Sequence, residues 1–163
     1  MTKNEYYECV MDAYRPAEAL IRRVPPDKLE WRPGPKFMSL GQLLRHLADG
    51  VGLPLRCLLT NDWPFQSPEA MEEQMKLENL PSCGVEEAVK KLEEDKAVLR
   101  QALAGVSEAD FSQKIVSAPW GTKGKVERMA VDFREHFTNH KMQLFTYLKL
   151  LDLPVNTDTL YFG

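Results

Sequence analysis

The chain of 163 residues contains three histidines, His46, His136 and His140. His136 and His140 are four residues apart, so on a helix their imidazoles project from one face and can share an ion. Three neutral imidazoles around a tetrahedral ion leave one position open for water or substrate, and nitrogen ligands suit zinc or nickel equally. Such an ion lowers the pKa of a bound water or thiol toward neutrality. These residue types therefore predict one catalytically competent divalent-metal site.

The surroundings of the histidines favour this interpretation over the simplest alternative, in which each ring is a core or boundary side chain hydrogen-bonded to a neighbour. His136 and His140 border an apolar stripe, where an unpaired polar ring is costly. His46 lies between Leu43 and Leu47, so the third ligand can come from a facing helix. The Glu of an H-E-x-x-H motif is missing between the pair, so zincin-type peptide hydrolysis is not supported.

Polar side chains within one helical turn of the histidines are candidates for hydrogen bonds to the ligand rings, and a carboxylate among them could also enter the coordination sphere. These candidates are Gln143, Asp49 and Asp132. The alternative for each is an ordinary surface position, which is the commoner role of such residues.

Four helical segments are predicted to position these side chains, because apolar residues recur in each at intervals of three and four. They span residues 5–24, 39–59, 85–103 and 126–151. Pro16 should bend or divide the first helix. Ser39 with Gln42 has the pattern of a capping box at the start of the second. The charges of the third helix are expected on a solvated face without a functional role.

The connections between these helices are long and irregular. Residues 25–37 hold four prolines and predict an extended loop, and residues 61–64 predict a turn before a partly helical surface connection over 67–84. A turn at 107–110 and a loop or small hairpin at 111–126 precede the last helix. We therefore expect an all-α protein with one domain, residues 1–163, folded as an antiparallel four-helix bundle.

The overall composition limits the partners. The formal net charge is -3 and no basic run could neutralise a row of phosphates, so nucleic acid is not an expected partner. No apolar stretch is long enough to cross a bilayer, and the first twenty residues lack the apolar run of a signal peptide. We therefore expect a cytoplasmic protein without a membrane partner, which acts on a small molecule.

Two segments of the chain resemble the DinB and YfiT-like superfamily. They are LEWRPGPKFMSLGQLLRHLAD and EHFTNHKMQLFTYLKLLDLPV, and the resemblance extends over nearly the whole chain. In that family a Trp-Arg-Pro loop leads into a helix with an L-x-H-L motif, and a later helix carries H-x3-H-x2-Q-L. The corresponding residues here are Trp31, Arg32 and Pro33, then His46, and finally His136, His140, Gln143 and Leu144.

The resemblance implies a four-helix bundle that holds zinc or nickel on the three histidines and assembles as a homodimer. Members with known chemistry are thiol-dependent enzymes, either S-transferases that join low-molecular-weight thiols to electrophiles or isomerases of maleylpyruvate. The first hypothesis is therefore a metal-activated thiol S-transferase or hydrolase that acts on small electrophilic molecules. The alternative is a non-catalytic, metal-binding stress-response protein in which the ion is structural. A pocket at the open metal position would favour the enzyme.

Overall fold

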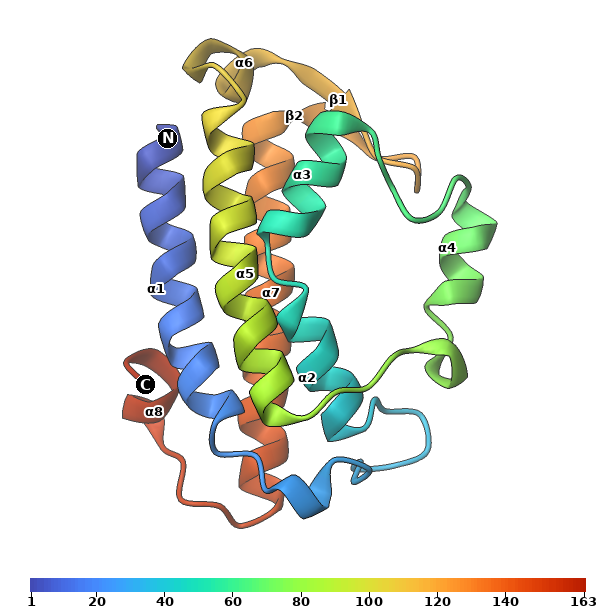
Figure 1. Ribbon diagram of the computed structural model, residues 1–163, viewed down its shortest axis with the longest axis vertical. Helices are drawn as coiled ribbons and strands as arrows, with labels where there is room; N and C mark the ends of the chain where they lie inside the picture. Colours follow the sequence, from blue (N-terminus) through green and yellow to red (C-terminus); the bar gives the residue numbers. More distant parts are fainter.

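The computed structural model describes all residues from 1 to 163, and most of them are helical, in agreement with the predicted class (Figure 1). The α-helices are α1 (Lys3–Ile21), α2 (Leu40–Ala48), α3 (Gly52–Thr60), α4 (Pro68–Gln74), α5 (Val85–Ala104), α6 (Glu108–Gln113), α7 (Val126–Leu150) and α8 (Thr157–Tyr161). The 3-10 helices are η1 (Pro26–Lys28) and η2 (Leu77–Asn79), and the strands are β1 (Ile115–Ser117) and β2 (Lys123–Lys125).

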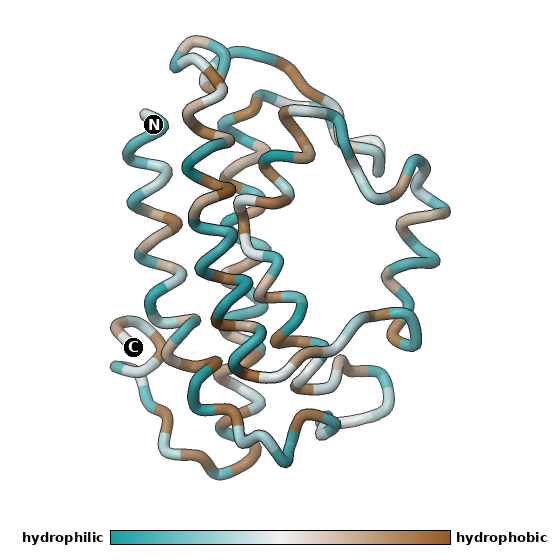
Figure 2. The backbone as a smooth tube through the Cα atoms, viewed as in Figure 1, coloured by the Kyte–Doolittle hydropathy of each residue, from teal (hydrophilic) through white to brown (hydrophobic).

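The core lies between four lengths of helix. Helix α1 packs on α5 and α7, and α2 and α3 lie end to end against the same two helices (Figure 1). Apolar residues recur along α5 and α7 between hydrophilic ones, so that each helix turns an apolar stripe inward (Figure 2). Leu47 of α2 and Leu144 of α7 are fully or almost fully buried. Burial of each such side chain stabilises the fold by about 1.5–3 kcal/mol.

Helix α1 continues through Pro16, so the proline does not divide it. Thr2 and Glu5 form a capping box that satisfies the amide groups at its start. Pro16 itself is buried, together with Ala13 and Ala17 on the same face. Packing of this face against the core outweighs the interior-proline penalty of about 3 kcal/mol.

The second predicted helix, residues 39–59, is interrupted and forms α2 and α3 instead of one continuous helix. Gly50 has a φ of 59°, in the left-handed region that ends a right-handed helix. A Cβ at Gly52 would lie 2.6 Å from both the carbonyl oxygen of Asp95 and the amide nitrogen of Leu99. The two glycines thus let the chain break its helix and approach the backbone of α5 closely.

Asp95 of α5 caps the new helix from outside. Its carboxylate accepts hydrogen bonds from the amide groups of Gly52 at 2.8 Å and Leu53 at 2.7 Å, and from the Tyr14 hydroxyl at 2.5 Å. The amide of Val51 donates to both the Tyr14 hydroxyl and Asp95. Burial raises the pKa of Asp95, although these hydrogen bonds oppose the shift. Asp95 therefore corrects the expectation that the charges of this helix are all solvated.

The capping box at the start of α2 is confirmed, since the Ser39 hydroxyl accepts from the amide of Gln42 at 3.2 Å and Gln42 Oε1 accepts from the amide of Ser39 at 2.9 Å. The side-chain Nε2 of Gln42 also donates to the carbonyl oxygens of Leu77 at 2.7 Å and Leu80 at 3.3 Å. Gln42 thereby fastens the end of the 61–84 connection to α2.

The other connections agree with the prediction in part. The 61–84 connection is partly helical, and α4 has no buried residue and stands apart from the core at the right of Figure 1. Strands β1 and β2 form the small antiparallel hairpin, with Val116 opposite Gly124. Helix α6, capped by Ser107, replaces the expected turn and loop at its position.

The C-terminal residues form one more helix that the sequence pattern did not indicate. Helix α8 packs against α1, and the ammonium of buried Lys141 on α7 donates to the carbonyl oxygen of Leu160 at 2.9 Å. Helix α8 has only five residues, which is too short for a helical period to be recognised in the sequence. None of the helices combines the length and the apolar character that a membrane span requires.

Candidate metal centre

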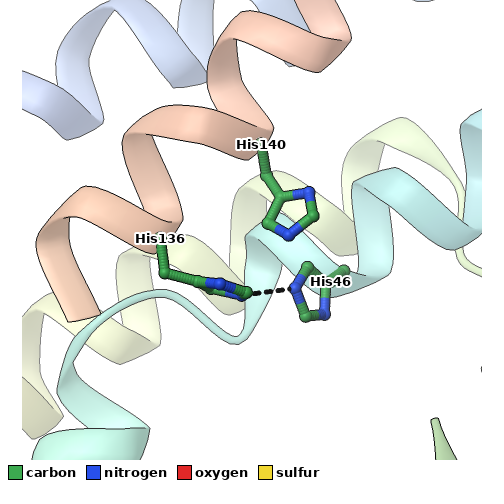
Figure 3. Close-up of side chains that lie close together, drawn as sticks. All are labelled: His46, His136 and His140. Carbon is green, nitrogen blue, oxygen red and sulfur yellow. Dashed lines mark hydrogen bonds between the residues drawn. The ribbon is translucent and has the colours of Figure 1, made fainter. Parts of the chain in front are cut away.

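The three histidines meet between two facing helices. His46 comes from α2, and His136 and His140 come from successive turns of α7 (Figure 3). One ring nitrogen from each lies within 4.8 Å of the others, and the Nε2 atoms of His46 and His136 are 2.9 Å apart. Ligand nitrogens of a tetrahedral ion are about 3.3 Å apart when each bond is about 2.0–2.1 Å. Small ring movements would therefore let all three bind one ion.

Local sequence explains why the rings face one another. Leu43 and Leu47 flank His46 on α2 and are buried, so their packing turns this side of α2 toward the core. On α7 the buried residue Phe137 follows His136 directly. The histidines therefore occupy the edge of both apolar faces, where His46 and His140 are half-buried and His136 is exposed.

The site keeps its imidazoles neutral. Burial, together with the neighbouring His140, His136 and Arg45, lowers the pKa of His46 to about 3. Partial desolvation by the surrounding atoms also lowers the pKa of His140 and of the more exposed His136, and the neighbouring His140 adds to the shift of His136. Neutral rings at pH 7 offer lone pairs without first releasing protons, which is the state that metal binding needs.

A chain of hydrogen bonds orients His140. Gln143 Oε1 lies 2.8 Å from His140 Nδ1, and the Gln143 amide group donates to the Tyr147 hydroxyl at 2.9 Å. That hydroxyl donates to the carbonyl oxygen of Met38 at 3.3 Å. Because the amide oxygen of Gln143 faces the ring, Nδ1 carries the proton and Nε2 keeps its lone pair for the other histidines.

Tyr147 was missed among the sequence candidates, although one signal was available. It follows His140 by seven residues and Gln143 by four, so it lies on the same face of α7. Nothing in the local pattern shows that its hydroxyl meets Met38, which is 109 positions away in the chain.

The two carboxylate candidates lie away from the rings. Asp49 forms an ion pair with Arg45, and Asp132 forms one with Arg128 at 2.7 Å. Each arginine precedes its carboxylate by four residues, so the two side chains are neighbours on one helix face. A carboxylate forms a stronger hydrogen bond with a charged guanidinium than with a neutral imidazole. Of the three predicted partners, only Gln143 forms a hydrogen bond to a histidine, and Asp49 and Asp132 form ion pairs with arginines instead.

A cavity of about 290 Å³ opens over the histidines. Its lining includes all three rings and Gln143, and its walls come from two loop segments that the sequence did not connect with the site. The wall residues are Lys36, Phe37, Met38, Met75, Leu77 and Leu80. Sequence reasoning missed them because both segments belong to connections without a recurring pattern, and only the tertiary fold brings them to α2 and α7.

Fold and site together define a mostly helical protein with a three-histidine cluster that could hold a metal ion. The chain belongs to the DinB superfamily, whose family model matches residues 12–143. The crystal structure of a protein from Exiguobacterium sibiricum 255-15, described as a DinB family member, has a similar fold, with a TM-score of 0.66 and 21% sequence identity over 96% of each chain. No curated protein matches this sequence.

Proposed function

We propose that this protein is a metal-dependent enzyme that transfers a small thiol to an electrophilic small molecule, with zinc or nickel held by His46, His136 and His140. The observation that carries the proposal is the cavity above the rings, which is lined by all three histidines and open to solvent. An ion that only joined two helices would need no such cavity. The cavity thus favours an enzyme over a protein in which the ion is structural.

The chain's own residues prepare the site. The three neutral rings converge, and the chain from Gln143 to Tyr147 fixes the proton of His140 on Nδ1. Apolar side chains, among them Phe37, Met75 and Leu77, form the walls around the space above the rings, which stays open to solvent. When bound, a divalent ion supplies charge that lowers the pKa of a thiol or water toward neutrality.

The cavity favours thiol transfer over hydrolysis. No aspartate or glutamate lines it, so no carboxylate is placed to take a proton from an attacking water. A thiol ionises more readily than water and can release its proton to solvent. The sulfur then forms a bond to the electrophilic carbon, and the leaving group departs with the electrons of its own bond. Hydrolysis stays the second possibility.

Metal analysis and a conjugation assay test this function together. The wild-type protein should retain close to one zinc or nickel ion per chain and accelerate the reaction of a small thiol with monochlorobimane. The His140→Ala variant should lose the ion and the acceleration. Full metal occupancy in this variant would exclude the site. Metal binding without acceleration, across several thiols, would support the structural role of the ion instead.

The bundle architecture and a homodimer are proposed together with this function. The four helical lengths, with α2 and α3 taken as one, support the antiparallel four-helix bundle. A homodimer stays a prediction, and sedimentation equilibrium of the metal-loaded protein would test it.

A further inference from the structure

The cavity over the histidines has walls of uneven chemistry. Its apolar side chains come from both loop segments, and the most exposed of them are Phe37 and Met75, at 48% and 46%. Large apolar side chains that are exposed to solvent at the mouth of a cavity are suited to contact a ligand. Lys36 is the only cationic side chain of the lining, because the three imidazoles are neutral, and no acidic residue lines the cavity.

Both walls are fastened to the helices that carry the histidines. The Gln42 side chain, one turn before His46, holds the carbonyl oxygens of Leu77 and Leu80. Tyr147 of α7 holds the carbonyl oxygen of Met38. The apolar surface therefore keeps a defined position relative to the metal site, and a ligand that binds it does not have to order the loops first.

Lys36 is also the group best placed to recognise an anion. It takes part in none of the ion pairs of the structure, and its side chain has no hydrogen-bond partner. The nearby start of α2 offers no competing site, because its first amide groups are already used. They donate to Trp31 (from Leu40), Leu29 (from Gly41) and the Ser39 hydroxyl (from Gln42).

We infer that the substrate or thiol bound here has an apolar body and one carboxylate. This inference rests on the proposed function and names the ligand class of the same site. The apolar body contacts Phe37, Met75 and Leu77, the carboxylate pairs with the Lys36 ammonium, and the reacting group lies above the histidines. A single ammonium balances the one negative charge of a carboxylate, whereas a phosphate monoester carries a charge of about −1.5 to −2 and would need further donors, such as an arginine fork or a free helix N-terminus.

Isothermal titration calorimetry on zinc-loaded protein tests the inference with a matched pair of thiols. The pair is 3-(mercaptomethyl)benzoate and its neutral isostere 3-(mercaptomethyl)benzamide. The wild type should bind the benzoate about fivefold more tightly, the gain expected of an exposed ion pair. Lys36→Ala should abolish this preference, and Lys36→Glu should reverse it. Lys114→Ala, the same change at an exposed position outside the cavity, should keep it.

A second arm tests the apolar wall. Phe37→Ser should weaken binding of the benzoate and leave binding of 3-mercaptopropionate, which has no ring, unchanged. A wild type that binds zinc but takes benzoate and benzamide equally would overturn the inference and leave the proposed function standing. A wild type that binds no zinc would overturn both.

Discussion

The Asp95 network and the histidine cluster are both polar groups at the edge of the same helical core, yet they differ in what the protein supplies to them. Asp95, with Tyr14 and the amide groups of residues 51–53, is buried, and the carboxylate receives every donor it needs from the chain. The histidine cluster, formed by His46, His136 and His140, faces a solvent-open cavity, and apart from the hydrogen bond between His140 and Gln143 its ring nitrogens have no partner but one another. A polar group that its own fold satisfies is structural, whereas convergent unsatisfied nitrogens indicate a ligand.

The largest expected effect comes from breaking the Asp95 network. Asp95→Ala leaves the Tyr14 hydroxyl and the amide groups at the start of α3 buried without an acceptor, so the free energy of unfolding should fall by about 3 kcal/mol or more. Urea denaturation measures the change. Glu94→Ala removes an exposed carboxylate from the adjacent position and should stay within about 0.5 kcal/mol of wild type. Equal effects of the two substitutions would contradict a structural role for Asp95.

The histidine cluster should behave differently, because substitutions there should weaken metal binding more than they lower the stability of the fold. Gln143→Ala removes the acceptor that fixes the His140 proton, so metal affinity should fall by about 10–100-fold. The free energy of unfolding of the metal-free protein should fall by only about 1 kcal/mol, the loss expected when a half-buried side chain gives up its hydrogen bonds to His140 and Tyr147. Competition with a chromophoric chelator measures the affinity, and Met142→Ala at the exposed neighbouring position is the control. An unchanged affinity would leave Gln143 without a role at the site.

Acid should distinguish the cluster from the rest of the core. Burial lowers the pKa of His46 to about 3, so the unfolded chain binds more protons than the folded chain below about pH 6.5. The contribution of His46 to the stability of the metal-free protein is therefore complete above about pH 6.5 and is lost as the pH falls toward 3. His46→Gln should flatten this part of the profile in chelator-containing buffer. If the variant's stability changed with pH as steeply as that of the wild type, the pKa of the His46 ring would not be lowered in the folded protein.

The smallest combined effect on stability and metal binding is expected at Tyr147, which belongs to the packed core and also contacts the histidine cluster through Gln143. The hydroxyl of Tyr147 is satisfied within the fold but acts on the cluster through Gln143. Tyr147→Phe should lower the unfolding free energy by about 1 kcal/mol and weaken metal binding by less than about tenfold. Thermal unfolding and the chelator competition measure both, with Tyr161→Phe at an exposed ring as the control. If Tyr147→Phe lowered the stability but left the metal affinity unchanged, the role of Tyr147 would be structural only.

Periodic and local features of this molecule could be predicted from its sequence. The long stripe of α7, the capping box of Ser39 and Gln42, and the pair His136 and His140 all depend on neighbours within one or two turns. Such spacing fixes the face of a helix whatever the rest of the chain does. The helical class followed from the same information, whereas the meeting of His46 with this pair, 90 positions away in the chain, was expected from the apolar borders of both helices and from the family resemblance.

The tertiary structure decided what depends on contacts between distant segments. A glycine in a helical pattern does not by itself end the helix. The helix breaks at Gly50 because Asp95 and Tyr14 accept hydrogen bonds from the amide groups that the break leaves without a helical partner. Asp49 and Asp132 lie within one helical turn of a histidine in the sequence, but each forms an ion pair with an arginine of its own helix.

The cavity is the plainest case of a feature that the sequence could not give. Its walls are two aperiodic loops separated by more than thirty residues, joined to the site by the side chains of Gln42 and Tyr147. Spacing along one helix therefore determined which rings could bind an ion. Long-range packing alone determined what surrounds them, because loop segments without a period acquire their position only from the surfaces they contact.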